Sequence, residues 1–368
     1  MEIEVFFEPK THFNERLIDF TDIISFSEVI RNLTNDSTSE GIIDILKDKE
    51  LCTIVTEDCS GVNAHVLENF EYLIKIFESA GTEKIWINNP PKFFFDKIIL
   101  FSEDIPVYNY KYPKISEEML KKVDSQFDNN IIGQQRAKEI ICRKLVAQMI
   151  RPSDKPLVLM FFGKPGIGKT ETAKYLSKIL YGNDDILREQ MSMVGGEMSV
   201  NYFKSTSHAE NSFSKKLLNR KSNVIPLDEF ALAPNFFHTS FFQMFDEGIY
   251  MDQNFTVDVG NSIIICTSNF LSLKEMKENI DEALLNRFDG FIPFTDFTMK
   301  EKETIIIQLF DKLVDVKVMN PKYLTLISKE EVLSQVRMQL PNLHSMRSIR
   351  KYMEDCISNL LLDVILKS

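Results

Sequence analysis

Residues 163–170 read Gly-Lys-Pro-Gly-Ile-Gly-Lys-Thr and match the pattern G-x-x-x-x-G-K-[ST]. The octet follows the apolar run 157–162 (LVLMFF), which predicts a buried strand, and opens into a helical pattern at 171–180 that ends at Gly182. A strand, a glycine-rich loop and a helix in this order are the phosphate-binding context of the pattern. The octet therefore predicts a nucleotide site in an α/β fold.

The residue types of the octet suit phosphate binding. Gly163, Gly166 and Gly168 let backbone N–H groups surround phosphate oxygens in conformations that a Cβ would hinder. The N-terminus of the following helix adds a partial positive charge. We expect Lys169 to reach the β- and γ-phosphates of ATP and the Thr170 hydroxyl to ligate Mg²⁺. The predicted nucleotide-binding segment is Gly163, Lys164, Pro165, Gly166, Ile167, Gly168, Lys169, Thr170 and Glu171.

Two acidic residues end a later apolar run. Residues 223–229 (NVIPLDE) predict a short buried strand that ends in Asp228 and Glu229. ATP hydrolysis needs a carboxylate near Mg²⁺ and a base that orients water, so we expect Asp228 to hold the metal through water and Glu229 to polarise the attacking water. The alternative is a strand that runs into a solvated turn. Pro226 lacks a ladder donor and indicates a bulge or a sheet edge.

Polar and basic residues further along complete the set of candidates. Residues 261–270 (NSIIICTSNF) predict another buried strand, and the amide of Asn269 at its end suits positioning the same water or the γ-phosphate. Arg287 lies in the sequence LLNRFD, and Arg347 lies in SMRSIR. A lone arginine on a helix is more often a surface residue, so a catalytic role for either depends on the order of the segments.

The negative charge of the chain is concentrated in its first third. Residues 1–125 contain 24 acidic and 13 basic residues, a net charge of −11, whereas residues 126–368 contain 30 of each and are neutral. Binding to DNA or RNA requires clustered Lys and Arg, so this distribution argues against a nucleic-acid partner. An acidic docking face and a merely solvated acidic surface both remain open.

Composition indicates a cytoplasmic protein without a membrane segment. The first residues carry Glu2, Glu4 and Glu8 instead of the basic start of a signal peptide, and no apolar stretch reaches the length of a membrane span. Five scattered cysteines suit a reducing compartment. Cys52 and Cys59 have no second pair nearby, so we expect core thiols and not zinc ligands.

Three segments are predicted along the chain. Residues 1–112 predict a small acidic α/β domain, a candidate for docking a partner or substrate. Residues 113–298 alternate apolar strands with helical patterns, which is typical of a parallel sheet flanked by helices. Residues 299–368 are expected to be helical throughout.

Individual elements are predicted within the first segment. Strands are expected at 51–56, 84–88 and 93–100, and the tyrosine-rich stretch 108–113 is expected to be a linker. An amphipathic helix is predicted between the first two strands from apolar residues three and four positions apart. These residues are Val66, Phe70, Leu73, Ile74 and Phe77.

The order of the motifs resembles the AAA+ ATPases, and most closely the Clp-type protein unfoldases. The glycine octet and the Asp-Glu pair correspond to the Walker A and Walker B motifs. Residues 128–137 (DNNIIGQQRA) are similar to the opening h-h-G-Q-x-x-A segment of the family, and 242–269 are similar to the Clp stretch that ends in the sensor strand. The resemblance covers roughly residues 125–368, and residues 1–112 lie outside it.

The resemblance implies roles for further residues. Ile131 and Ile132 would pack against the adenine, and Asn269 falls on sensor 1. Arg287 falls on the arginine finger, and Arg347 falls on the sensor-2 arginine. Clp-type ATPases assemble as rings, usually hexamers, with ATP at subunit boundaries. The resemblance therefore implies an Mg²⁺-dependent ATPase that assembles with copies of itself, with the finger acting in trans and a helical lid at the C-terminal end.

The resemblance is incomplete at the loop with which the family grips its substrate. The family pattern is Gly-aromatic-hydrophobic-Gly between the Walker motifs, and the corresponding residues 200–204 here read VNYFK. Tyr202 and Phe203 keep the bulky pair and are the pore-loop candidates. Both flanking glycines are replaced, so the alternative that both aromatic side chains are buried stays open.

Three functions follow from these observations. The first is a ring-forming, ATP-driven protein remodeller or unfoldase with a protein client. The second is an ATP-dependent assembly switch or regulatory subunit, for example of a stress or phage-defence system, in which nothing is threaded; the acidic N-terminal segment and the lost glycines favour it modestly. The third is a DNA-directed motor, which the neutral core and acidic front domain disfavour.

Overall fold

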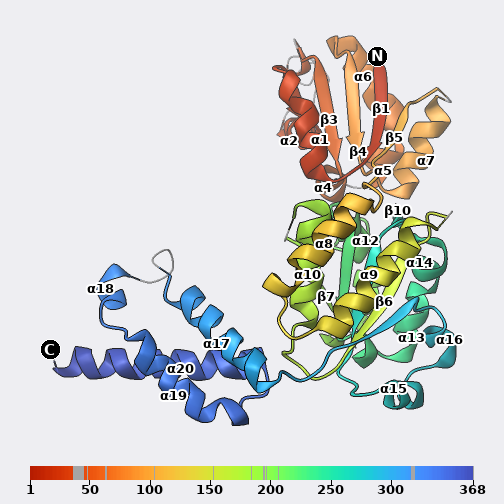
Figure 1. The fold of residues 1–368 in the computed structure, drawn as a ribbon. Helices are drawn as coiled ribbons and strands as arrows, with labels where there is room; N and C mark the ends of the chain where they lie inside the picture. The colour runs from red at the N-terminus through yellow and green to blue at the C-terminus, as the bar shows by residue number, and fades with distance from the viewer. Residues whose placement is uncertain are drawn as a thin grey trace.

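The computed structural model describes residues 1–35, 45–47, 49–62, 64–102, 104–151, 153–183, 185–193, 195, 197–205, 207–315 and 320–367. Two parallel sheets of five strands each lie one above the other in Figure 1, and helices of the C-terminal segment extend to one side. The predicted α/β fold with flanking helices is confirmed. None of the helices in the described ranges is long and apolar enough to cross a membrane.

The N-terminal sheet has the strand order β2-β3-β4-β1-β5, and all its neighbouring strands are parallel. Its strands are β1 (Glu2–Phe7), β2 (Ile23–Ser25), β3 (Leu51–Val55), β4 (Lys84–Asn88) and β5 (Val107–Asn109). Its helices include α1 (Lys10–Arg16), α2 (Phe26–Asn35), α4 (Thr56–Ser60), α5 (Ala64–Glu68), α6 (Phe70–Ala80) and α7 (Lys92–Phe101). The predicted strands at 51–56 and 84–88 are thereby confirmed, whereas the single amphipathic helix is divided into α5, which holds Val66, and α6, which holds the other four apolar residues.

The strand predicted at 93–100 is wrong, because these residues form helix α7. Phe94 and Ile98 are its buried side chains and lie four positions apart, which is the period of a helix. A short apolar run fits a buried strand or a buried helix, and its length does not decide between them. Tyr108 lies in β5, so the sheet reaches into the stretch expected to be a linker.

The second sheet has the order β12-β6-β11-β8-β7 and is also parallel. Its strands are β6 (Leu157–Phe162), β7 (Glu189–Gln190), β8 (Val224–Asp228), β11 (Ile263–Thr267) and β12 (Gly290–Pro293). Its helices include α8 (Glu117–Asn130), α9 (Gln135–Met149), α10 (Lys169–Tyr181), α11 (Glu197–Lys204), α12 (Phe213–Leu218), α13 (Asn235–His238), α14 (Phe242–Glu247), α15 (Leu273–Asn279) and α16 (Glu282–Leu285). An antiparallel hairpin joins β9 (Ile249–Met251) and β10 (Thr256–Asp258).

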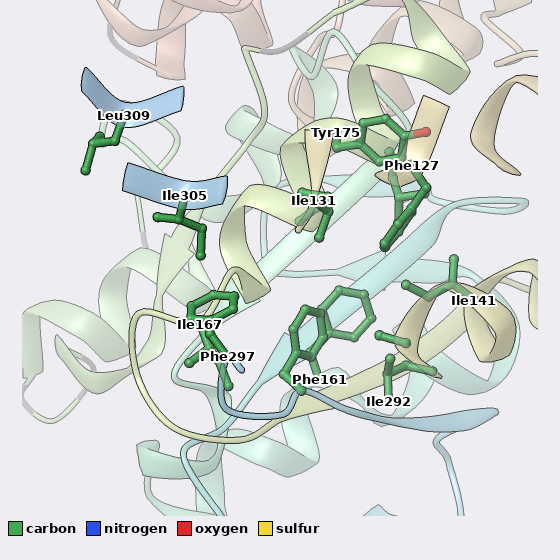
Figure 2. Packing of buried hydrophobic residues seen from close by; sticks show 14 of the residues in the cluster. Phe127, Ile131, Ile141, Phe161, Ile167, Tyr175, Ile292, Phe297, Ile305 and Leu309 are labelled. Carbon is green, nitrogen blue, oxygen red and sulfur yellow. The ribbon is translucent and has the colours of Figure 1, made fainter. Parts of the chain in front are cut away.

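Both faces of the second sheet are buried, which explains its continuous apolar strands. Along β6, Leu157, Leu159 and Phe161 contribute to one core, and the alternate residues Val158 and Met160 contribute to another. The first core includes residues of α8, α9 and α10, and Figure 2 shows Phe161 beside Ile141 and Ile292. The second core is rich in phenylalanine and includes residues of α12 and α14.

The C-terminal segment packs as a helical unit, as predicted. Its helices are α17 (Met299–Leu313), α18 (Pro321–Leu324), α19 (Lys329–Gln339) and α20 (Met346–Lys367). Thr298 begins α17 with a capping box, in which Thr298 and Glu301 satisfy each other's backbone N–H groups. Ile349 and Met353 of α20 are fully buried, and they join the same core as Ile305 of α17.

Pro226 lies in β8, one strand in from the sheet edge. The carbonyl of Asn223 accepts a hydrogen bond from Ile263 of β11, so the backbone groups of every second residue from Asn223 face β11. The nitrogen of Pro226 therefore faces the β7 side, where pairing begins only at Leu227. The short edge strand does not need the donor that proline lacks, so no ladder hydrogen bond is lost.

Candidate active site

The candidate site lies where three adjacent parallel strands end. β11 lies between β6 and β8, and the carboxyl ends of parallel strands meet at one edge of a sheet. The glycine octet 163–170 follows β6, Asn269 is the second residue after β11, and Asp228 ends β8. The topology thus brings together residues that are far apart in the sequence.

The three glycines of the octet all have positive φ angles. The values are +135° at Gly163, +75° at Gly166 and +109° at Gly168, a region that L side chains rarely adopt. A Cβ on Gly163 would also lie 2.4 Å from the carbonyl oxygen of Phe294. Helix α10 begins directly after Gly168, so its N-terminus faces the loop. The loop therefore has the form that the pattern predicted for a phosphate cradle.

Lys169 is buried within this loop. Its Nζ donates to the carbonyl oxygens of Gly163 at 2.5 Å and Lys164 at 2.8 Å, and to Asn269 Oδ1 at 3.2 Å. Burial lowers the pKa of Lys169 from its ordinary value to about 8, although Asp228 and Glu229 oppose the shift. The ammonium is thus held among carbonyl oxygens at the centre of the cradle.

The remaining residues of the octet face other neighbours. Ile167 is buried in the first core, whereas Pro165 and Glu171 are exposed. Lys164 forms an ion pair with Asp296, and Glu171 forms one with Lys174. Phosphate contacts from this part of the loop would therefore come from its backbone N–H groups.

Asp228 accepts contacts from two hydroxyls and one cation. Thr170 Oγ1 lies 3.4 and 3.3 Å from its two carboxylate oxygens, and Thr267 Oγ1 lies 3.2 Å from Oδ1. Arg188, which precedes β7, forms an ion pair with Oδ2. The side chain of Asp228 is only 3% exposed. A hydroxyl and a carboxylate in contact are hard oxygen donors of the kind that Mg²⁺ prefers.

Glu229 is held in a specific orientation beside the loop. Its φ of +56° places it in the left-handed region, and its N–H donates to Thr267 Oγ1 at 2.8 Å. Its carboxylate accepts hydrogen bonds from the Ser192 hydroxyl and, at 3.2 Å, from Gln190 Nε2. The bond from Ser192 is the main cause that lowers the pKa of Glu229, so the carboxylate is charged and can accept a proton.

The segment around Ile131 connects the loop to the C-terminal helices. Ile131 is buried in the first core, and Ile132 packs against that core. Gln134 Nε2 donates to the carbonyl oxygens of Ile167 at 3.3 Å and Thr295 at 3.0 Å. Figure 2 shows Ile131 between Tyr175, Ile167 and Ile305 of α17. The flat face of an adenine base would pack beside these isoleucines, next to the loop.

Comparison with known proteins identifies the module. Residues 154–316 match the family model described as AAA domain (Cdc48 subfamily). Residues 154–316 therefore carry a AAA domain, and the chain is similar in sequence to Clp ATPases. Two ClpL proteins, ATP-binding subunits of ATP-dependent Clp protease from Staphylococcus aureus strains RF122 / ET3-1 and USA300, are each 30% identical over 217 residues. These alignments cover 53% of this chain and 31% of each relative, so the chain matches about a third of their length.

Solved structures agree in fold. The chain superposes on the S. cerevisiae Hsp104-ADP complex with a TM-score of 0.61 and 14% identity, over 100% of this chain and 88% of that chain. A closed-state cryo-EM reconstruction of Hsp104 with ATPγS and FITC casein gives a TM-score of 0.56 and 16% identity over the same shares. At these identities the likeness establishes an Hsp104-like fold and nothing finer.

Arg347, beyond the residues that match the family model, lies beside the glycine loop. The N–H of Met346 donates to the carbonyl oxygen of Gly166 at 2.8 Å, and a Cβ on Gly166 would lie 3.8 Å from Arg347 Cβ. The charge of Arg347 also contributes to the lowered pKa of Glu229. The first turn of α20 is therefore placed where the sensor-2 assignment requires it, although that role stays a prediction.

Arg287 lies apart from this cluster in the AAA+ module. Its Nε donates to Asp246 at 2.9 Å, and its guanidinium lies 3.7 Å from the ring centroid of Phe242. Figure 1 shows α16, which precedes Arg287, well separated from α10. This position suits a residue that would act on a neighbouring subunit, which is the role predicted from the resemblance.

Tyr202 and Phe203 lie in helix α11, not in an extended loop. Phe203 is 5% exposed in the second core, with the ring of Phe213 at 5.3 Å. Tyr202 is half-buried, and its hydroxyl donates to Glu189 Oε1 at 2.7 Å. The buried alternative left open by the sequence thus describes Phe203 fully and Tyr202 in part.

Four residues of the site were not predicted from the sequence. These residues are Gln134, Arg188, Gln190 and Ser192. Gln134 carries a signal, because it is the glutamine of the h-h-G-Q-x-x-A segment. The other three lie just before, within and just after the two-residue edge strand β7, with Ser192 in a short 3-10 helix, and these segments have no periodic pattern to detect.

Proposed function

We propose that this chain binds ATP with Mg²⁺ at the glycine loop and hydrolyses it. The observation that carries the proposal is the meeting of Lys169, Thr170, Asp228 and Asn269, with Glu229 next to Asp228, at the ends of three adjacent strands. Mg²⁺ would neutralise the phosphates and be held by the Thr170 hydroxyl and, through water, by the Asp228 carboxylate.

Each protein group has a defined task in the proposed reaction. Lys169 offers a cation at the loop for the β- and γ-phosphates, where its present carbonyl contacts would be exchanged for phosphate oxygens. Glu229, kept charged by Ser192, accepts a proton from the attacking water. Asn269 accepts a hydrogen bond from Lys169, and its amide would orient the attacking water or the γ-phosphate.

We further propose that the chain works as a ring, with Arg287 reaching the γ-phosphate of the adjacent subunit. A hexamer in the cytoplasm is the assembly that the Clp likeness favours. In this proposal residues 113–298 and 299–368 are the large and lid subdomains, and residues 1–112 dock a protein partner. The work performed would be the remodelling or unfolding of a protein client, and the excess of acidic residues in the N-terminal third argues against nucleic acid.

A second candidate is an assembly switch that threads nothing. Two observations favour it. Phe203 is packed in the core, and the loop after α11 is bound to the N-terminal domain. There His208 Nε2 contacts the carbonyl oxygen of Val62 at 3.4 Å, and Ser60 Oγ donates to the His208 carbonyl at 3.1 Å. An aromatic grip on a moving chain requires side chains free to leave their packing.

Phosphate release from ATP tests the proposal, measured for the protein alone, with an unfolded protein and with single-stranded DNA. Glu229→Gln is expected to lower turnover by about 10²–10⁴-fold and to retain ATP through gel filtration. Rapid hydrolysis by Glu229→Gln would remove this residue as the base. A rate of phosphate release that unfolded protein stimulates in the wild type but not in Tyr202→Ala would support protein remodelling. A rate that neither unfolded protein nor single-stranded DNA changes, together with ATP-dependent assembly, would support the assembly switch.

A further inference from the structure

Arg188 forms an ion pair with Asp228, the carboxylate proposed to hold Mg²⁺. It immediately precedes β7, whose Gln190 is in register with Asp228 of β8. Side chains two positions apart lie on one face of a strand, so Arg188 and Gln190 point to the same side. Arg188 Nε contacts Asp228 Oδ2, and Gln190 Nε2 contacts Glu229. One short edge segment thus touches both acidic residues of the site.

The charge balance of Asp228 explains why a cation lies there. The carboxylate is almost completely buried, and a buried charge without compensation is strongly unfavourable. The two hydroxyls that contact it, from Thr170 and Thr267, are neutral. Arg188 is therefore the cation in contact with Asp228, in addition to the nearby charge of Lys169, and half of the arginine side chain stays exposed.

We propose that Arg188 is the counter-ion of Asp228 in the metal-free protein and leaves Asp228 when Mg²⁺ and nucleotide bind. The inference rests on the proposed function, since it presumes that the metal is held by Thr170 and Asp228. A divalent cation and a guanidinium on one buried carboxylate repel each other, so the two are alternatives there. Arg188 is a positioning residue: it acts through Asp228 and sets how much Mg²⁺ the site requires.

The same exchange links the nucleotide site to helix α11. Glu189, next to Arg188, accepts hydrogen bonds from Tyr202 Oη at 2.7 Å and from Lys216 Nζ at 2.8 Å. Ser192, four residues after Arg188, holds the Glu229 carboxylate. Release of Arg188 from Asp228 therefore loosens one end of a segment whose other contacts hold the Glu229 carboxylate and Tyr202 of α11.

The test is the Mg²⁺ dependence of nucleotide binding by the full chain. Binding of a fluorescent ADP analogue is followed while Mg²⁺ is titrated into metal-free protein, for the wild type, Arg188→Ala and Arg188→Lys. Arg188→Ala is expected to reach half-saturation at about tenfold lower Mg²⁺, because it removes the competing charge. Its melting temperature without ligand is expected to fall by about 2–4 °C, since Asp228 loses its counter-ion. Arg188→Lys, which keeps the charge, is expected to stay close to the wild type.

Lys221→Ala is the matched control, because Lys221 is a surface cation paired with Asp185 at 2.9 Å. It removes one positive charge without touching Asp228 and is expected to behave as the wild type. An unchanged or higher Mg²⁺ requirement in Arg188→Ala, with nucleotide still bound, would overturn the role of Arg188 alone. Failure of the wild type to bind the analogue at any Mg²⁺ concentration would overturn this inference together with the proposed function.

Discussion

Burial gives Lys169 a proton equilibrium close to neutral pH. Its pKa of about 8 in the free protein means that the ammonium is charged below that pH and increasingly neutral above it. Phosphate favours the charged form, so nucleotide binding above pH 8 must include uptake of a proton. We therefore expect the association constant for ADP to fall by up to about tenfold per pH unit between about pH 8 and pH 10. Calorimetric titration across this range measures the effect.

The control for this prediction is Lys169→Arg. A guanidinium stays protonated throughout the range, so any binding that Lys169→Arg retains is expected to vary little with pH. A wild-type affinity that is flat from pH 7 to about pH 10 would show that Lys169 keeps its ordinary pKa.

The backbone conformation of the glycine loop depends on the lack of a side chain at Gly163. Gly163→Ala adds a Cβ at 2.4 Å from the Phe294 carbonyl oxygen and forces alanine to a φ of +135°. We expect loss of nucleotide binding and a fall in unfolding free energy above the roughly 1–2 kcal/mol that a left-handed alanine alone costs. Gly182→Ala is the comparison, because Gly182 also has positive φ but nothing lies within 4 Å of its Cβ position. Equal losses in denaturant unfolding would rule out the clash as the cause.

At the scale of elements, the packing of α11 can be tested directly. Phe203 lies among the rings of Phe213, Phe237 and Phe241, so Phe203→Ala is expected to reduce the free energy of unfolding by about 3–5 kcal/mol. Phe236→Ala, on the neighbouring helix α13 with 61% of the residue exposed, is expected to cost under about 1 kcal/mol. Chemical denaturation compares the two. A small loss in Phe203→Ala would return Phe203 to the pore-loop candidates.

The elements show which parts of the fold a sequence can predict. The strand, loop and helix around 157–180 were predictable because every signal is local and the glycines need positive φ angles. Residues 2–7, for which we predicted no element, form β1, although Ile3 and Val5 alternate with exposed or half-buried acidic residues in the period of a strand. Helix α7 was mistaken for a strand because its apolar residues form two short runs around Asp96 and Lys97, and runs of this length do not reveal the period of a helix.

The site divides in the same way. Lys169, Asp228 and Asn269 were predicted because each ends or follows a buried strand, and the carboxyl ends of parallel strands converge on one sheet edge. Arg188 and Ser192 were missed because they reach the acidic pair only through the pairing of β7 with β8, which is a contact between distant residues. Nothing in the residues of so short an edge strand specifies its partner or its register.

At the scale of the whole molecule, Lys215 connects the second domain to the N-terminal domain. Its Nζ donates to Ser60 Oγ of the N-terminal domain at 2.7 Å and to the His208 carbonyl at 2.6 Å. We expect Lys215→Ala to speed amide hydrogen exchange in α4 and in 207–215, and to leave β6 protected as before. Lys216→Ala is the control, because Lys216 binds Glu189 within the AAA+ module. Equal rates of amide hydrogen exchange in the two variants would show that the Lys215–Ser60 contact does not stabilise the interface between the two domains.

Ring assembly predicts that two inactive variants restore each other. Arg287→Ala lacks the finger but keeps Glu229, and Glu229→Gln lacks the base but keeps the finger. If Arg287 acts in trans, a mixed ring contains interfaces at which an intact Glu229 faces an intact Arg287. A random one-to-one mixture should then recover about a quarter of the wild-type rate per site, since each intact partner is present half of the time.

The contacts of Arg287 indicate how that rate should be measured. In the single chain the Arg287 guanidinium contacts Asp246 and Phe242, so it reaches a neighbouring site only after subunits assemble. The mixture should therefore be measured at protein concentrations at which rings form. Each variant alone, at the same total concentration, supplies the baseline. A mixture that stays at this baseline at every ratio, while still forming mixed rings, would show that Arg287 does not complete the site of its neighbour. A cis finger gives that result, because each subunit then lacks one of the two groups it needs.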